Sequence, residues 1–77
     1  MVTSLSIHFR DQQLATATLD KGTVVVNGDD SVKQVVDYYR KFAEGQALLD
    51  LLVKRMRGQW WVEELDNHPS PEVVHNG

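Results

Sequence analysis

The sequence predicts a small α+β domain in which a three-stranded antiparallel meander is followed by a helical segment and a fourth strand, with the helical layer on one face of the sheet. Three observations carry this prediction. Apolar and polar side chains alternate from Ser4 to Arg10, which is the period of a half-buried strand. Apolar residues recur at helical spacing between Ser31 and Arg57. Aromatic and β-branched residues gather again between Gln59 and Leu65.

The first part of the chain predicts three strands joined by short turns. Ser4–Arg10 alternates strictly, and Leu14–Leu19 alternates with threonines, so each run has the period of a strand with one buried face. The tripeptide Asp-Lys-Gly at 20–22 is typical of a tight hairpin turn. The β-branched run Thr23–Val26 then predicts a third strand. Together these features predict the antiparallel meander.

The helical segment carries two apolar stripes on opposite sides of one helical wheel. Before Gly45 the apolar residues fall within one arc of about 120°: Val32, Val35, Val36, Tyr39, Phe42 and Ala43. After Gly45 the large apolar residues point the opposite way: Leu48, Leu49, Leu52 and Met56. Tyr38 is the large residue of the first half that shares the angle of the second stripe. Gly45 therefore marks a change of apolar face.

Two structures account for this inversion. If Gly45 ends one helix in a left-handed conformation, a second helix starts near Gln46 and both stripes reach one core. If one long helix continues through Gly45, one face covers the sheet and the other needs a partner; an interior glycine costs only about 1 kcal/mol. The residues expected to meet such a partner are Tyr38, Leu48, Leu49, Leu52 and Met56. The sequence leaves both structures open.

Signals at both ends frame the helical segment. Ser31 followed by Gln34 matches a capping box, which predicts that Ser31 caps the helix N-terminus. The basic residues Lys54, Arg55 and Arg57 complement the negative end of the helix dipole. The helical segment is therefore expected to run from about Ser31 to Arg57.

Length and composition limit the class of protein. The 77 residues allow one small domain, which we place at residues 1–66, and the aperiodic stretch 67–77 is predicted to be a disordered tail. The sequence has no cysteine, so neither disulfides nor a cysteine-based zinc site supplement the small core. No signal-peptide pattern and no apolar run of membrane-spanning length are present, so we expect a cytoplasmic protein without membrane contact.

Side chains at catalytic or metal-binding spacing are not apparent in the sequence. The histidines, His8, His68 and His75, form no pair with metal-ligand spacing on a predicted element. Four serines also lack an evident base partner for nucleophilic catalysis: Ser4, Ser6, Ser31 and Ser70. We therefore expect a protein that is not an enzyme and that holds no metal or other cofactor.

A basic segment stands directly before two tryptophans. Lys54, Arg55 and Arg57 could neutralise phosphates while Trp60 stacks on bases, but the net charge of −3 argues against a general nucleic-acid binder. Adjacent residues of a strand face opposite sides, so one of Trp60 and Trp61 is predicted to lie in the core. The other is expected to be exposed or to lie in an interface, where tryptophan is enriched.

The function expected from these features is protein–protein interaction. The chain would act as a homodimer, or as a docking subunit on another protein, through the second apolar face and an exposed tryptophan such as Trp61. The small size of the chain and its lack of cysteine, without any motif, suggest an accessory protein of a phage or mobile element. The alternative is a nucleic-acid-binding regulator, an antitoxin-like dimer that uses the basic segment Lys54–Arg57.

Overall fold

The computed structural model describes residues 2–65 and confirms the α+β class, with two helices rather than one. The elements in chain order are β1 (Ser4–Phe9), β2 (Gln12–Asp20), β3 (Thr23–Gly28), α1 (Asp30–Tyr39), α2 (Gly45–Met56) and β4 (Trp61–Leu65). The predicted domain 1–66 covers these elements, whereas the tail predicted at 67–77 lies outside the described residues.

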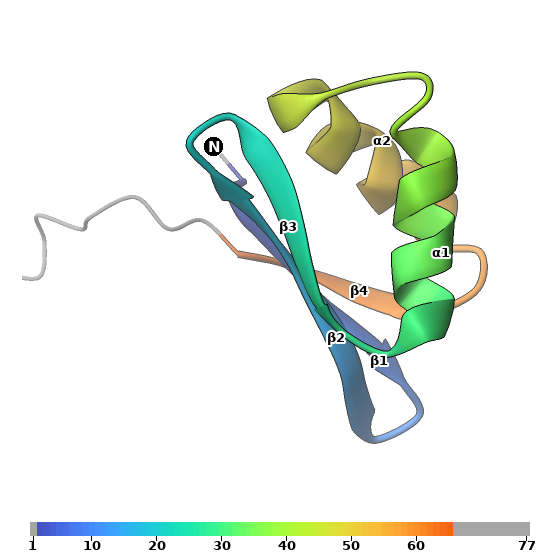
Figure 1. Ribbon diagram of the computed structural model, residues 1–77. Coiled ribbons are helices and arrows are strands. Elements are labelled where there is room, and N and C mark those ends of the chain that lie inside the picture. Colours follow the sequence, from blue (N-terminus) through green and yellow to red (C-terminus); the bar gives the residue numbers. More distant parts are fainter. Residues whose placement is uncertain (1, 66–77) are drawn as a thin grey trace, which may run out of the picture.

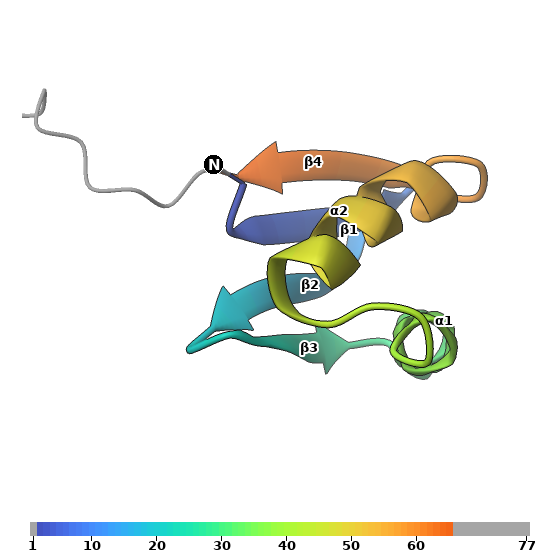
Figure 2. The same cartoon turned by 90° about the horizontal axis from the view of Figure 1, so that it is seen from above.

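The four strands form one antiparallel sheet in the order β3-β2-β1-β4. Figure 2 shows the strands side by side in this order, with β3 and β4 at the two edges. Both helices lie on the same side of the sheet (Figure 1), so within residues 2–65 no helix covers the opposite face. The β2–β3 hairpin closes through Lys21 and Gly22, whose φ angles of 52° and 83° are those of a type I′ turn. Within the part of the chain that the structure describes, the sheet therefore has one face covered by helices and one open face.

The helical segment is interrupted between Tyr39 and Gly45, as in the first of the two structures considered above. After Tyr39 the backbone tightens, because the N–H of Phe42 bonds the carbonyl of Tyr39 only three residues back. Gly45 has a left-handed φ of 59°, but it opens α2 instead of capping α1. A single straight helix with two opposed faces, the other structure considered, is wrong.

The break brings both apolar stripes into one core between helices and sheet. Four residues of the second stripe, with 0–1% of their surface exposed, pack there with the first stripe apart from Phe42 and with the inner sheet face: Leu48, Leu49, Leu52 and Met56. This corrects their assignment to a partner-binding face. The chain's own sheet already covers them, because α2 starts in a new direction after residues 40–44.

The N-terminus of α1 is capped by Asp29, not by Ser31. The carboxylate of Asp29 accepts hydrogen bonds from the Ser31 backbone N–H, at 3.0 Å, and from the Ser31 hydroxyl. The capping box predicted from Ser31 and Gln34 is therefore wrong by two residues. The acidic residue that precedes the helix provides the cap, which is one of the commonest arrangements at this position.

Candidate functional site

The two tryptophans divide between core and surface as adjacent strand residues must. Trp60 is 8% exposed and joins the core, whereas Trp61, the first residue of β4, is 64% exposed on the open face of the sheet. The prediction that one tryptophan is buried is confirmed. Trp61 therefore remains a candidate contact residue, and Trp60 is not accessible for stacking on a base.

Three aromatic side chains gather where α1 ends and border a groove beside α2. The ring of Tyr38 lies 5.0 Å from that of Tyr39 and 5.4 Å from that of Phe42, measured between centroids. Phe42 and Tyr38 are 65% and 53% exposed. Leu51 and Arg55 of α2 complete the lining of this open groove, whose volume is about 390 Å³. We call Tyr38, Tyr39, Phe42, Leu51 and Arg55 the helix groove.

The helix groove carries positive charge. Arg55 is exposed and forms no ion pair with any acidic residue in the part of the chain that the structure describes. The Lys41 amino group lies 5.6 Å from the centroid of the Tyr38 ring, within the range of a cation–π contact. The groove thus combines apolar rings with the cation of Arg55, and Lys41 lies beside it, on a chain whose net charge is −3.

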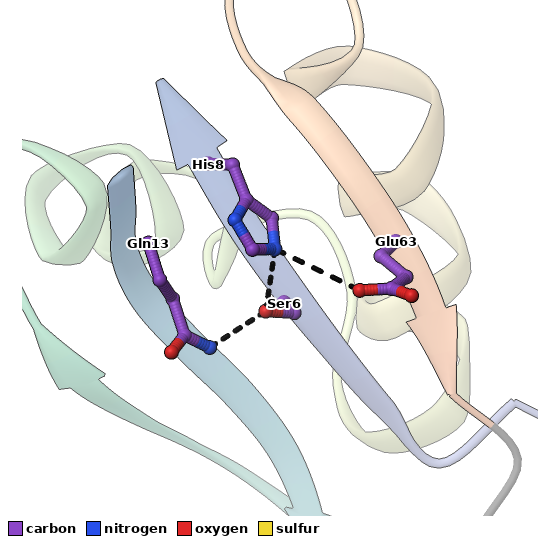
Figure 3. A network of polar contacts seen from close by, with 4 residues as sticks. All are labelled: Ser6, His8, Gln13 and Glu63. Carbon is purple, nitrogen blue, oxygen red and sulfur yellow. Dashed lines mark hydrogen bonds and ion pairs between the residues drawn. The ribbon is translucent and has the colours of Figure 1, made fainter. Parts of the chain in front are cut away.

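A second cluster lies on the open sheet face, where β2, β1 and β4 each contribute polar side chains (Figure 3). The Gln13 amide donates to the Ser6 hydroxyl oxygen at 2.6 Å, and that oxygen lies 2.9 Å from Nε2 of His8. A carboxylate oxygen of Glu63 is 3.7 Å from the same nitrogen. The Trp61 ring lies 5.0 Å from the His8 ring. These five residues line one end of the open face.

The contact between Ser6 and His8 was not predicted from the sequence. The signal was present, since residues two apart on a strand share a face. The geometry nevertheless differs from a serine–histidine–acid triad, in which hydroxyl and carboxylate bind different ring nitrogens. Here Ser6 and Glu63 both approach Nε2, and Ser6 is itself buried in the sheet. The cluster therefore links three strands without the arrangement that activates a nucleophile.

The basic residues proposed for nucleic acid do not act as one set. Arg57 pairs with Glu64 of β4, while Lys54 and Arg55 are exposed on α2. Arg55 belongs to the helix groove, whereas Lys54 borders a separate hollow with Ala47. Lys54, Arg55 and Arg57 are neighbours in the sequence, but their side chains lie in three different surroundings.

Sequence reasoning also misplaced Phe42. The helical wheel put it on the buried stripe with Val36, but α1 ends at Tyr39 and the wheel no longer applies three residues later. Leu51 was not considered, because its angle lies beside the second stripe. Tyr38, the residue that did not fit the wheel, was the signal that pointed to this groove.

The described residues contain neither a cluster of metal-binding side chains nor a helix that could span a membrane. Within residues 2–65, no three histidine, aspartate or glutamate side chains lie close enough together to hold a metal ion. Neither α1 nor α2 is long and apolar enough to cross a membrane. Comparison with protein-family models, curated proteins and solved structures gave no match for this chain.

Proposed function

We propose that the protein is a small, non-enzymatic interaction protein that forms a homodimer through the helix groove. The observation that carries the proposal is the juxtaposition of a projecting aromatic pair, Phe42 and Tyr38, with a hollow lined by Tyr39 and Leu51. A symmetric dimer uses the same patch on both copies, so the patch needs both a projection and a hollow. The helix groove has both.

The energetics favour covering this surface. Each large apolar side chain that is moved from water into an interface contributes roughly 1.5–3 kcal/mol. Phe42 is the most exposed large apolar residue within residues 2–65, and a symmetric contact buries it twice. A 77-residue chain has a small core of its own, and association is one of the usual ways to enlarge it.

Arg55 adds selectivity to this contact. It has no acidic partner among the described residues and lies in the same groove as Tyr38. In a symmetric dimer the aromatic side chains of one copy reach the Arg55 of the other. A cation over an aromatic face contributes about 0.5–2 kcal/mol, the larger value applying where water is excluded.

We prefer this function to nucleic-acid binding. Trp60 is buried, and Arg57 is neutralised by Glu64, so the alternative keeps only Lys54 and Arg55. Two separated cations on an acidic chain provide little of the electrostatic attraction on which binding to phosphate backbones depends.

Light scattering coupled to size exclusion tests the proposal. The native chain should elute as a dimer at micromolar concentration, and Phe42→Ser should elute as a folded monomer with an unchanged far-ultraviolet circular dichroism spectrum. Phe9→Ser is the matched control, because Phe9 is also an exposed aromatic residue but borders a different hollow at the end of β1. A native chain that stays monomeric up to 100 µM, or a dimer that survives Phe42→Ser, contradicts the proposal.

A further inference from the structure

The two edges of the sheet differ in how their backbone groups are covered. At the β3 edge, the side chain of Arg40 donates a hydrogen bond to the carbonyl oxygen of Val24 at 2.7 Å. The chain between α1 and α2 also passes here, since Ala43 and Gly45 border the same hollow as Val24. At Val24 the β3 edge is therefore covered by the chain itself. Covering an edge in this way prevents unwanted strand pairing.

Within residues 2–65, the β4 edge has no such cover. In an antiparallel ladder, consecutive residues direct their backbone N–H and C=O groups alternately to the two neighbouring sides. The Leu19 N–H bonds the Thr3 carbonyl at 2.8 Å, which fixes this alternation across the sheet. It follows that Glu63 bonds inward to Ser6 on β1, while Val62 and Glu64 direct their backbone groups outward.

Nothing in residues 2–65 pairs with this outer side, because β4 is the last strand of the sheet. The edge therefore offers the alternating donors and acceptors that a further strand requires. Strand addition of this kind takes its affinity from the backbone, and its selectivity comes from the side chains that flank the edge.

The flanking side chains define what would be selected. Trp61 and Glu63 are two residues apart on β4, so both lie on the open face of the sheet. The Glu63 side chain is 52% exposed, and its carboxylate lies 3.7 Å from the His8 ring nitrogen, a long contact. On the other face, Val62 is buried and Glu64 is neutralised by Arg57. The edge thus presents the exposed Glu63 carboxylate beside an exposed indole ring.

We infer that the β4 edge is a docking site for an extended segment of another protein that carries an arginine or lysine. The segment pairs with the outward backbone groups of Val62 and Glu64 as a fifth strand. Its basic side chain lies on the open face between Trp61 and Glu63. There the cation meets the carboxylate and the face of the indole ring together.

A second copy of this chain is a poorer occupant than a basic segment. Pairing of two β4 edges brings the Glu63 and Glu64 carboxylates of both copies to one seam, and like charges on neighbouring strands are destabilising. Among the described residues of each copy, Arg57 is already paired with Glu64, and His8 contacts Glu63 only at 3.7 Å. Charge complementarity therefore favours a basic partner.

The experiment uses the full chain and two blocked synthetic peptides that alternate threonine and valine, one with a central arginine and one with a central glutamate. Nuclear magnetic resonance follows amide exchange, and calorimetry gives the affinity. The arginine peptide should slow exchange of the Val62 and Glu64 amides at least tenfold. The glutamate peptide should bind at least tenfold more weakly, and methylation of the arginine peptide's backbone nitrogens should abolish binding.

Two variants separate a specific site from general attraction. Glu63→Gln should lower the affinity for the arginine peptide at least threefold. Glu44→Gln, which changes an exposed carboxylate before α2, should leave that affinity unchanged. Equal binding of both peptides, or binding without protection of Val62 and Glu64, overturns the inference. Concentration-dependent protection of these amides without peptide identifies a second copy as the occupant and also overturns it. Phe42→Ser keeps the β4 edge, so the result is independent of dimerisation through the helix groove.

Discussion

The backbone N–H of Asp29 donates a hydrogen bond to the carbonyl oxygen of Leu14 at 3.0 Å, and this contact fixes the start of α1 against the sheet. Leu14 is the extra residue of a bulge in β2, where the register with β1 shifts between Ile7 and His8. The bond lies one step beyond the Ala15–Gly28 pair and continues the regular β2–β3 ladder, despite the bulge on the β1 side. The end of the β2–β3 hairpin therefore positions the first helix.

The same close approach leaves no room for a side chain at Gly28. A Cβ atom at this position would lie 2.3 Å from the Leu14 carbonyl oxygen and 2.6 Å from the Cα atom of Ala15, and the φ of Gly28 is 130°. Gly28→Ala should therefore lower the free energy of unfolding by at least about 2 kcal/mol, because backbone atoms must move. Gly22→Ala is the control, because Gly22 also has a positive φ but an added Cβ would meet no atom within 4 Å. Its free energy of unfolding should fall by about 1 kcal/mol. Urea denaturation measures both, and equal losses would disprove the steric explanation.

Two neighbouring leucines of α2 should respond oppositely to a charge. Leu52 is fully buried in the core, whereas Leu51 is half-buried on the wall of the helix groove. Leu52→Lys should lower the free energy of unfolding by about 4 kcal/mol or more and unfold much of the protein at 37 °C. Leu51→Lys should remain folded, because its ammonium group can reach water. Thermal melts followed by circular dichroism distinguish the two. A folded Leu52→Lys would mean that α2 does not use this face to cover the sheet.

The strands could be predicted from the sequence because their signals are local. Alternation from Ser4 onward and the turn at 20–22 specify β1, β2 and β3 without reference to the rest of the fold. The reversal of the apolar stripe indicated a break in the helix, but it did not show at which residue the first helix ends. Phe42 and Ala43 keep the helical period of Tyr39 although the helix has already ended. Periodicity reports which side chains are apolar, and it does not report where the backbone stops being helical.

The candidate surfaces were less predictable because they join residues that are distant in sequence. Tyr38 meets Arg55 only because α2 reverses direction after residues 40–44, and His8 meets Glu63 only because β4 returns beside β1. Single-sequence patterns contain no such pairing information. Trp61 could be proposed from sequence, since one of two adjacent strand tryptophans must leave the core.

The two tryptophans should report separately on core and surface. Trp61→Phe leaves Trp60, whose burial should give blue-shifted emission and weak quenching by acrylamide. Trp60→Phe leaves Trp61, which should emit at longer wavelength and show a Stern–Volmer constant at least threefold larger. The Trp60→Phe protein must first be shown to be folded by circular dichroism, because the substitution removes core volume. Similar quenching in the two folded variants would contradict the assignment of Trp60 to the core.

The helix cap predicts a specific acid response. A hydrogen bond from the Ser31 hydroxyl, and then one from the Ser31 backbone N–H, hold the pKa of Asp29 below its ordinary value of 3.8. A carboxylate whose folded-state pKa is depressed contributes stability that is fully present above the unfolded-state pKa. That contribution is lost as the pH falls from about 3.8 through the lower folded-state value, because the unfolded chain binds the proton first.

Asp29→Asn isolates this contribution, since asparagine is also a good N-cap but does not titrate. Urea denaturation between pH 2 and pH 6 should show that the difference in stability between the native chain and Asp29→Asn shrinks below about pH 4 and is constant above about pH 5. Ser31→Ala should reduce the pH dependence without removing it, because the backbone N–H of residue 31 still donates. If native and Asp29→Asn proteins lose stability in parallel over the whole range, the Asp29 carboxylate does not cap α1 in solution.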